Sequence, residues 1–343
     1  MTTPIISRKR LMLAVQESAL GTAVTLLAAH GVTNCFDAKI EIDSALIERE
    51  AQMSAGRLYG VAGATKGKAT WWNEIYGKGS SGVPYWVTSS LLQCGCANSS
   101  GVISPSLDIG TGATVGTYQG SGSGARLKQL CGAMGNAVMD FEIGKPGKIT
   151  WAFDGLYIPA TSGSPVTPTY DTVTPPTCVS MTITVGSTAY VLGKVKFDLG
   201  NKVMMRPSLG GAYGYQSAWI TDRKPMLTID PEAVALSATD WYGIYQAGTP
   251  LAVSMQLGSA VNNTMTLAIA KAQLMKPPTD GDRDGNLIDN LEFLCCQNAS
   301  TADSACGPAT ATPRIGSVPT PLTSCYAPVR PAPWCPTRPC TMP

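Results

Sequence analysis

The chain has 343 residues, of which 44% are hydrophobic and 14% charged, and its formal net charge is +2. This hydrophobic content excludes a largely disordered chain, and the near-neutral balance excludes a nucleic-acid binder held by bulk positive charge. The charged fraction is low against about 25% in typical soluble domains, which suits a surface that becomes covered by copies of itself. No run reaches the ~20 apolar residues of a membrane-spanning helix, so no membrane contact is predicted.

The N-terminal segment imitates an export signal. Arg8, Lys9 and Arg10 precede the apolar residues 11–15, but Gln16 and Glu17 interrupt that stretch where an export signal is most apolar. We therefore favour a chain that is not exported and keep export as the alternative.

Two segments of the chain resemble each other, which indicates an internal duplication. Residues 38–43 (AKIEID) and 193–198 (GKVKFD) both alternate apolar and polar side chains, as half-buried strands do. In each copy an irregular stretch follows, and then a second strand. The irregular stretches are residues 44–64 and 199–218, and the second strands lie in residues 65–72 and 221–228. The irregular stretches are too long for ordinary hairpins, so we expect them to contact neighbouring molecules.

Each copy also has one helix candidate. In the first copy Pro84 opens the helix and Gly95 closes it. In the second, Ser237-Ala-Thr-Asp240 resembles a capping box, and Gly248 is positioned as a C-cap. Alternating strands then close the copies at residues 136–153 and 262–274.

Composition divides the chain into four parts. The region between the copies is rich in Pro, Thr and Ser and is predicted to be a linker, and the end of the chain has many prolines and no regular apolar period. The predicted parts are a first domain with an N-terminal arm (1–158), a linker (159–177), a second domain (178–300) and a Pro/Cys-rich C-terminal extension (301–343).

The chain has eleven cysteines, an odd number, and six of them lie at or after Cys295. Scattered cysteines usually serve as small buried apolar residues. The extension holds an even set, able to form two disulfides in any of three connectivities or to remain free thiols. This set is Cys306, Cys325, Cys335 and Cys340.

Two sequence features resemble functional sites but fit structural roles better. Asp280-Gly-Asp-Arg-Asp-Gly285 resembles the start of a calcium loop, but Leu291 stands where a bidentate Glu is needed. A hairpin turn between strands is therefore predicted there. His30 is the only histidine, and no partner motif surrounds it. We expect no metal, no cofactor and no enzyme activity.

Several segments, taken in order across residues 8–297, resemble the tail tube proteins of long-tailed bacteriophages. They are RKRLMLA (8–14) with Glu17 and GTA (21–23), LLQCG (91–95), LCGAMGNAV (130–138), GKPGKI (144–149) with FDGLY (153–157), FDLGNKV (197–203), and ITDRKP (220–225) with IDPE (229–232). The residues after Ser300 fall outside this resemblance.

The resemblance implies a mainly β fold with two tandem tube-like β-sandwich or half-barrel domains, each flanked by one helix, followed by an irregular extension. It implies a structural virion protein, assembled in the host cytoplasm, whose stacked rings form the hollow phage tail tube and deliver the genome. Its partners would be itself, the tape measure, the terminator and the baseplate or tip, and DNA would pass non-specifically through the lumen. If other tubes close with six single domains, a duplicated subunit closes as a trimeric ring with pseudo-sixfold symmetry rather than as a hexameric one.

The irregular stretches and the strands beside them supply the candidate contacts between rings and subunits, because a guanidinium fork pairs well with carboxylates or carbonyls across an interface. These candidates are Arg49, Arg57, Arg206, Asp222 and Arg223. The alternative function is a secreted or surface-displayed β-sandwich adhesin with a disulfide-bonded C-terminus.

Overall fold

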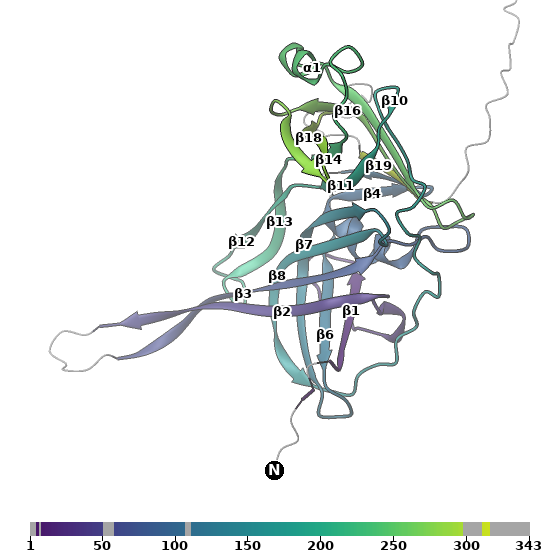
Figure 1. Cartoon of the computed structure of the whole chain (residues 1–343). Coiled ribbons are helices and arrows are strands. Elements are labelled where there is room, and N and C mark those ends of the chain that lie inside the picture. Colours follow the sequence, from purple (N-terminus) through teal and green to yellow (C-terminus); the bar gives the residue numbers. More distant parts are fainter. Residues whose placement is uncertain (1–4, 7, 51–57, 107–110, 298–310, 316–343) are drawn as a thin grey trace, which may run out of the picture.

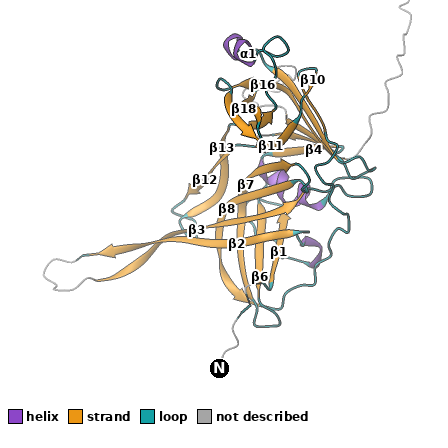
Figure 2. Cartoon of the chain, viewed as in Figure 1, coloured by secondary structure: helices purple, strands orange, loops and turns teal. Residues whose placement is uncertain are grey.

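The computed structural model describes residues 5–6, 8–50, 58–106, 111–297 and 311–315. Strands dominate these residues, and the helices are few and short (Figure 2). The predicted mainly β class is confirmed. Every described strand except β12 and β13 belongs to one hydrogen-bonded network.

The strands between residues 10 and 162, called the first half below, pair antiparallel in the order β2–β3–β8–β7–β6–β1 (Figure 1). Strand β1 contains the apolar stretch that resembles an export signal, and its Leu13 is fully buried. The strands are β1 Arg10–Gln16, β2 Cys35–Arg49, β3 Leu58–Glu74, β6 Ala113–Gln119, β7 Arg126–Glu142 and β8 Lys148–Ser162, with a small hairpin of β4 Cys96–Ser99 and β5 Val102–Pro105.

The strands between residues 182 and 295, called the second half, pair in the order β11–β14–β18–β16–β15–β9–β10. Strand β17 pairs with the first part of β18 and continues the line of β16. The strands are β9 Thr182–Val185, β10 Thr188–Ala189, β11 Leu192–Asp198, β14 Met226–Pro231, β15 Leu251–Leu257, β16 Met265–Leu274, β17 Thr279–Arg283 and β18 Asn286–Cys295.

Strand β7 joins the two halves. Its first part pairs with β6, and its residues 138–142 pair with residues 194–198 of β11. This internal junction is extended by backbone hydrogen bonds from Ile143 N to Gly193 O and from Leu199 N to Ala137 O. The buried side chains of both halves, from Trp151 to Phe293, belong to one continuous cluster. The core is therefore shared across the junction.

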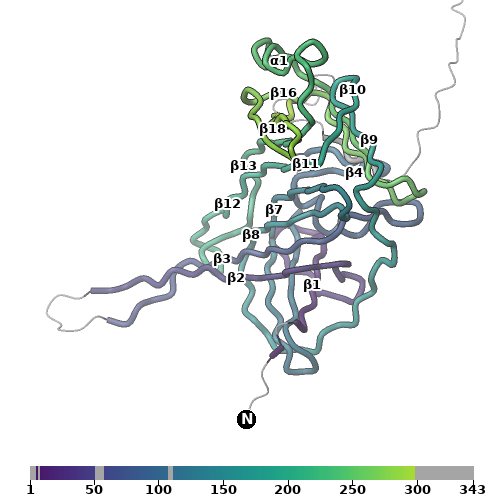
Figure 3. The backbone as a smooth tube through the Cα atoms, viewed as in Figure 1, coloured from purple at the N-terminus to yellow at the C-terminus, as the bar shows by residue number. Residues whose placement is uncertain are grey.

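The two stretches predicted to be irregular are β-hairpins. The first is the outer part of β2 and β3, which stay paired from Ser44 and Thr65 out to Arg49 and Leu58, and which project from the body as a long arm (Figures 1 and 3). The second is the hairpin of β12 Asn201–Pro207 and β13 Tyr215–Arg223, which lies against β7 and β8. The prediction of loops is wrong because glycine and charged side chains obscure the apolar alternation, whereas strand pairing needs only the backbone.

The first predicted helix exists but is irregular. It begins directly after Pro84, passes through a π-helical turn, η2 Val87–Leu91, and ends in a 3-10 turn, η3 Leu92–Cys94. Gly95 closes it with a φ of 75°, as the sequence predicts. One further short turn, η1 Ala28–His30, follows β1.

The second predicted helix is α1 Trp241–Ala247, and Gly248 closes it with a φ of 62°. The predicted start at Ser237 is too early. The N-cap is Asp240, whose carboxylate accepts a hydrogen bond from Gly243 N at 2.9 Å. Aspartate is itself a strong N-cap residue, so it displaces the expected Ser237.

The linker and the extension both contain more strand than expected. Strand β8 runs to Ser162, so the first residues of the predicted linker 159–177 are sheet. The middle of the linker is fixed to the first half by hydrogen bonds from Tyr76 Oη to Asp171 (3.1 Å) and from Asp171 N to Thr33 Oγ1 (3.0 Å). In the extension, β19 Ala311–Ile315 pairs with residues 265–269 of β16. Its one proline removes a single donor from the ladder.

Candidate assembly interface

The arm exposes large apolar side chains on both of its strands. Leu46 is 66% exposed, Ile47 54% and Tyr59 93%, and Leu58 and Val61 are also exposed. Within the arm, Arg49 Nε and Nη2 both donate to Tyr59 O, at 3.0 and 2.9 Å. Arg49 therefore braces the arm instead of reaching outward. Arg57, the other arginine predicted here, lies outside the described residues.

Arg206 and Asp222 lie on the β12–β13 hairpin and are exposed. The guanidinium of Arg206 lies 5.7 Å from the ring centroid of Trp219, within cation–π range. A groove lined by Met204, Arg206, Pro207 and Trp219 opens beside them. Both predicted residues are thus accessible to another molecule.

Arg223 is buried, at 8% exposure, and binds its own chain. Its Nε donates to Asn201 Oδ1 and its Nη2 to Cys94 O, both at 2.6 Å. Burial lowers its pKa. Arg223 therefore ties the end of the first helix to the β12–β13 hairpin from a buried position, whereas the sequence predicted a contact with another molecule. Its charged neighbours Asp222 and Lys224 gave no local sign of this burial.

Strand β2 presents an unpaired edge. Within the described residues it pairs only with β3, whereas β11 pairs on both sides, with β14 and β7. Arg10 Nη1 donates to Ala38 O at 3.0 Å, and Lys128 Nζ donates to Ile40 O at 3.4 Å. These carbonyls face away from β3, so the edge carries acceptors and two cationic side chains. An unpaired edge of this kind is a template for another strand.

Strand β17 presents a second edge, and this one is acidic. In the described part of the chain β17 pairs only with β18, and Asp280, Asp282 and Asp284 are exposed along it. Asp284 and Gly285, with φ of 53° and 86°, form the two-residue turn to β18. The hairpin predicted in place of a calcium loop is confirmed. Burial, with the charge of Asp280 opposite, raises the pKa of Asp289 on β18.

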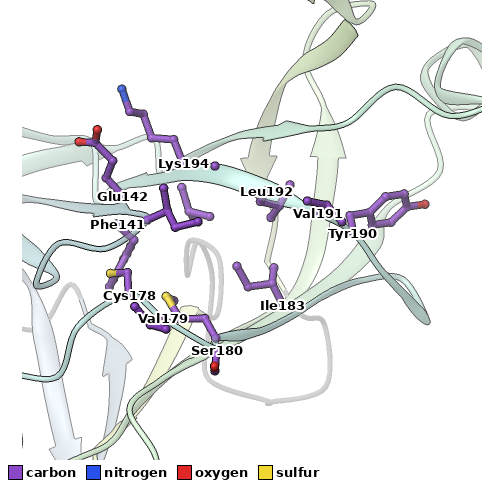
Figure 4. Close-up of a pocket in the computed structure, with 14 residues that line it drawn as sticks. Phe141, Glu142, Cys178, Val179, Ser180, Ile183, Tyr190, Val191, Leu192 and Lys194 are labelled. Atoms are coloured by element: carbon purple, nitrogen blue, oxygen red, sulfur yellow. The ribbon is translucent and has the colours of Figure 1, made fainter. Parts of the chain in front are cut away.

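A pocket of about 260 Å³ lies where the two halves meet (Figure 4). Phe141, Ile183 and Leu192 line it, and Glu142 and Lys194, which are paired across the β7–β11 ladder, lie near its rim. Burial raises the pKa of Cys178 in its wall, which disfavours a reactive thiolate. The pocket is a gap at the internal junction and holds no nucleophile paired with a base.

The remaining predicted residues form no chemical site. His30 Nδ1 accepts a hydrogen bond from Leu27 N at 3.0 Å and so closes a local turn. Within the described ranges, no group of three or more His, Cys, Asp or Glu side chains is placed to hold a metal ion. The seven cysteines in those ranges are free thiols, and Cys306, Cys325, Cys335 and Cys340 lie outside them. Among the described helices, none has the length and apolar character needed to cross a bilayer.

No model of a known protein family matches this chain, and no curated protein matches it either.

Proposed function

We propose that this protein is a structural subunit of a bacteriophage tail tube, which assembles with copies of itself into stacked rings. The support comes from the sheet edges: among the described residues, the two halves pair directly at the β7–β11 junction and leave two further edges, on β2 and β17, without a partner strand. A protein that works by polymerising needs such edges, and a closed ring removes them.

The strand orders of the two halves support a duplication. The order β2–β3–β8–β7–β6–β1 matches the order β11–β14–β18–β16–β15–β9 strand for strand. Strands β16 and β17 together take the place of β7: β16 matches its first part and β17 matches its last part. The strands also follow one another along the chain in the same sequence, and in both halves the helix comes after the second strand of the paired hairpin. We therefore infer two tube-like half-barrel domains, 1–158 and 178–300, joined by residues 159–177.

Strand pairing corrects one part of the sequence alignment. Ile42 and Phe197, which the alignment matches, lie opposite Gly67 and Leu227. The alignment of residues 65–72 with 221–228 would instead match Gly67 with Arg223. The hairpins inserted between these strands differ in length, which explains why simple counting along the chain fails.

The single observation that carries the proposal is the β7–β11 junction. It joins the second half to the first, edge to edge, through residues 138–142 and 194–198. In the described residues the corresponding edges at the other ends of the chain, on β2 and β17, have no such partner. Repeating the junction from chain to chain generates a ring in which three chains supply six similar domains.

A tube of this kind serves as a conduit for the genome. DNA moving through a lumen must bind weakly, and its affinity rises with the number of phosphate contacts. A net charge of only +2 on 343 residues fits a wall that does not retain DNA. The tape measure, the terminator and the baseplate or tip proteins are the other partners that this role implies, and assembly would take place in the host cytoplasm.

Negative-stain electron microscopy of the purified chain, with its mass in solution measured by light scattering, tests the proposal. We expect rings or hollow tubes and a mass that grows with concentration. A chain that stays monomeric at high concentration and low salt would contradict a self-assembling tube.

A further inference from the structure

The internal junction between the halves shows how two chains would meet. Within one chain, Met139 of β7 lies opposite both Ile149 of β8 and Phe197 of β11. In the second half, Asp282 and Leu287 lie opposite each other. By the matched strand order, Asp282 corresponds to Met139 and Leu287 corresponds to Ile149. Gly67 opposite Gly155, and Leu227 opposite Phe293, fix this correspondence.

The matched residues are buried in one half and exposed in the other. Ile149 and Phe197 are 0% and 1% exposed, and both belong with Met139 to the core cluster that spans the internal junction. Leu287 corresponds to Ile149 and is 57% exposed, and Ile42 corresponds to Phe197 and is 38% exposed. Each half therefore exposes an apolar residue whose counterpart in the other half is buried, as expected for two edges that can pair in the manner of the internal junction.

We infer that the edge of β2 in one copy, which Arg10 and Lys128 reach, pairs antiparallel with the edge of β17 in a second copy, in the register of the β7–β11 junction. Ile42 then lies opposite Asp282, and Glu41 lies opposite Arg283. The partner is a second copy of this chain, and the contact is head-to-tail. This inference rests on the proposed function and adds the residues, the register and the charges of the contact.

The backbone groups agree with this register. The carbonyls of Ala38 and Ile40 face away from β3, since the side chains of Arg10 and Lys128 donate to them. On β11 the corresponding edge group, Gly193 O, accepts from Ile143 N in the next strand. Arg10 and Lys128 thus occupy, in the single chain, acceptors that a partner strand would take over.

The cationic groups at the β2 edge are Arg10 and Lys128, which reach its carbonyls. Strand β2 itself exposes Lys39 and the carboxylates of Asp37, Glu41 and Asp43. The β17 edge carries Asp280, Asp282 and Asp284, all exposed. Within one chain the internal junction also pairs opposite charges, with Lys194 opposite Glu142 and Lys196 opposite Asp140. Opposite charges directly across a ladder stabilise it, and like charges destabilise it.

A charge-exchange experiment on the full chain tests the pairing. Variant R10E/K128E makes the β2 edge acidic, and variant D280K/D282K makes the β17 edge basic. We expect each variant alone to need a roughly tenfold higher concentration to assemble, because like charges then face each other. The chain with all four substitutions has complementary edges again and should recover assembly. A control, K78E/K224E, changes two exposed lysines that belong to neither edge.

Circular dichroism and thermal unfolding establish that every variant is folded, and carbodiimide cross-linking of the wild type supplies a direct readout. We expect links from Lys128 to residues 280–284 between chains. Normal assembly of both folded double variants, or failure of the folded fourfold variant to recover, would overturn the inference. Wild-type rings that form without such links would overturn this register and leave the tube proposal standing. A wild type without rings would contradict the proposed function itself.

Discussion

At the residue scale, Arg223 shows how a guanidinium can be structural where the sequence suggests a contact. It bridges Asn201 Oδ1 and Cys94 O from a buried position, and lysine cannot reproduce that fork. We expect R223K to lower the free energy of unfolding by about 2–3 kcal/mol, since a charge-assisted hydrogen bond is lost in a buried site. Urea unfolding checks this.

The matched control is R206K on the same hairpin, where Arg206 is exposed beside Trp219. Its effect should stay within about 1 kcal/mol, the usual worth of an exposed cation–π contact. If R223K were as stable as wild type but failed to assemble, Arg223 would be a contact residue as the sequence first suggested.

Glu17 is a second residue whose role depends on the fold. The sequence marks it as an interruption of an apolar stretch and as one residue of the tail-tube resemblance. In the structure it is 2% exposed, and its carboxylate accepts hydrogen bonds from Gly21 N (2.9 Å), Gly132 N (2.8 Å) and Thr114 Oγ1 (2.8 Å). Glu17 therefore ties the segment after β1 to β6 and to the middle of β7.

The pKa of Glu17 is raised, because desolvation by burial outweighs the three hydrogen bonds. A raised pKa means that the folded chain holds the proton more tightly than the unfolded chain. The contribution of Glu17 to stability is therefore largest below its ordinary pKa and falls as the pH rises through the folded-state pKa.

The variant E17Q cannot titrate and places an amide where a carboxylate oxygen accepts from Gly21 N. We expect E17Q to lower the free energy of unfolding by about 1–3 kcal/mol at low pH. The difference in this free energy between E17Q and wild type should narrow as the pH rises. Urea unfolding of both chains across mildly acidic to neutral pH measures this. A difference that widens with pH would show that the hydrogen bonds outweigh the burial.

At the scale of single elements, local chemistry determined the turns and ends, and long-range pairing determined the rest. Pro84, Gly95 and Gly248 mark helix boundaries that the structure keeps, since each acts through its own backbone. The arm and the β12–β13 hairpin could not be found in this way, because their strands are held by partners up to about twenty residues away in sequence. The same holds for the candidate interface. Its residue types were visible in the sequence, but the sheet edges on which they lie were not.

The arm and the β12–β13 hairpin occupy matched places but differ in what covers them. The β12–β13 hairpin packs Ala218 and Ile220 on Met134 of β7, which is fully buried. The matched residue in the second half is Met275. Its backbone N–H donates to Glu292 O, at the position where Met134 is paired with Asp154 in the first half. The side chain of Met275 is 38% exposed. We therefore expect the arm of one copy to cover Met275 of the next.

Shortening the arm tests this role. Leu46 and Ala62 lie directly opposite each other, so residues 47–61 can be replaced by a two-residue Asn-Gly turn. The shortened chain should keep its thermal stability, because the described residues of the arm beyond that point, 47–50 and 58–61, are all exposed. Long tubes should fail to form, which electron microscopy and sedimentation would show. Normal tubes from the shortened chain would contradict a role for the arm in assembly.

At the scale of the whole molecule, the two halves share one core, and their relation was only partly visible in the sequence. The alignment of residues 38–43 with 193–198 identified the matched strands, because apolar alternation is local. It could not show that β11 inserts against the end of β7, since that pairing joins segments more than fifty residues apart. Such contacts depend on which edge remains free once each half has folded.

Ring symmetry is the prediction that belongs to this scale. The internal junction already joins two halves of matching strand order, so three chains that repeat it would supply six such halves and three further junctions of the same geometry. Class averages of rings viewed along their axis should show threefold symmetry with six similar lobes, alternating slightly because the β2–β3 arm and the β12–β13 hairpin differ. Mass measurement of isolated rings should give three chains. Six chains per ring would mean that the two halves do not occupy equivalent positions in the ring. The match in strand order would then be a similarity of fold that has no counterpart in the ring contacts.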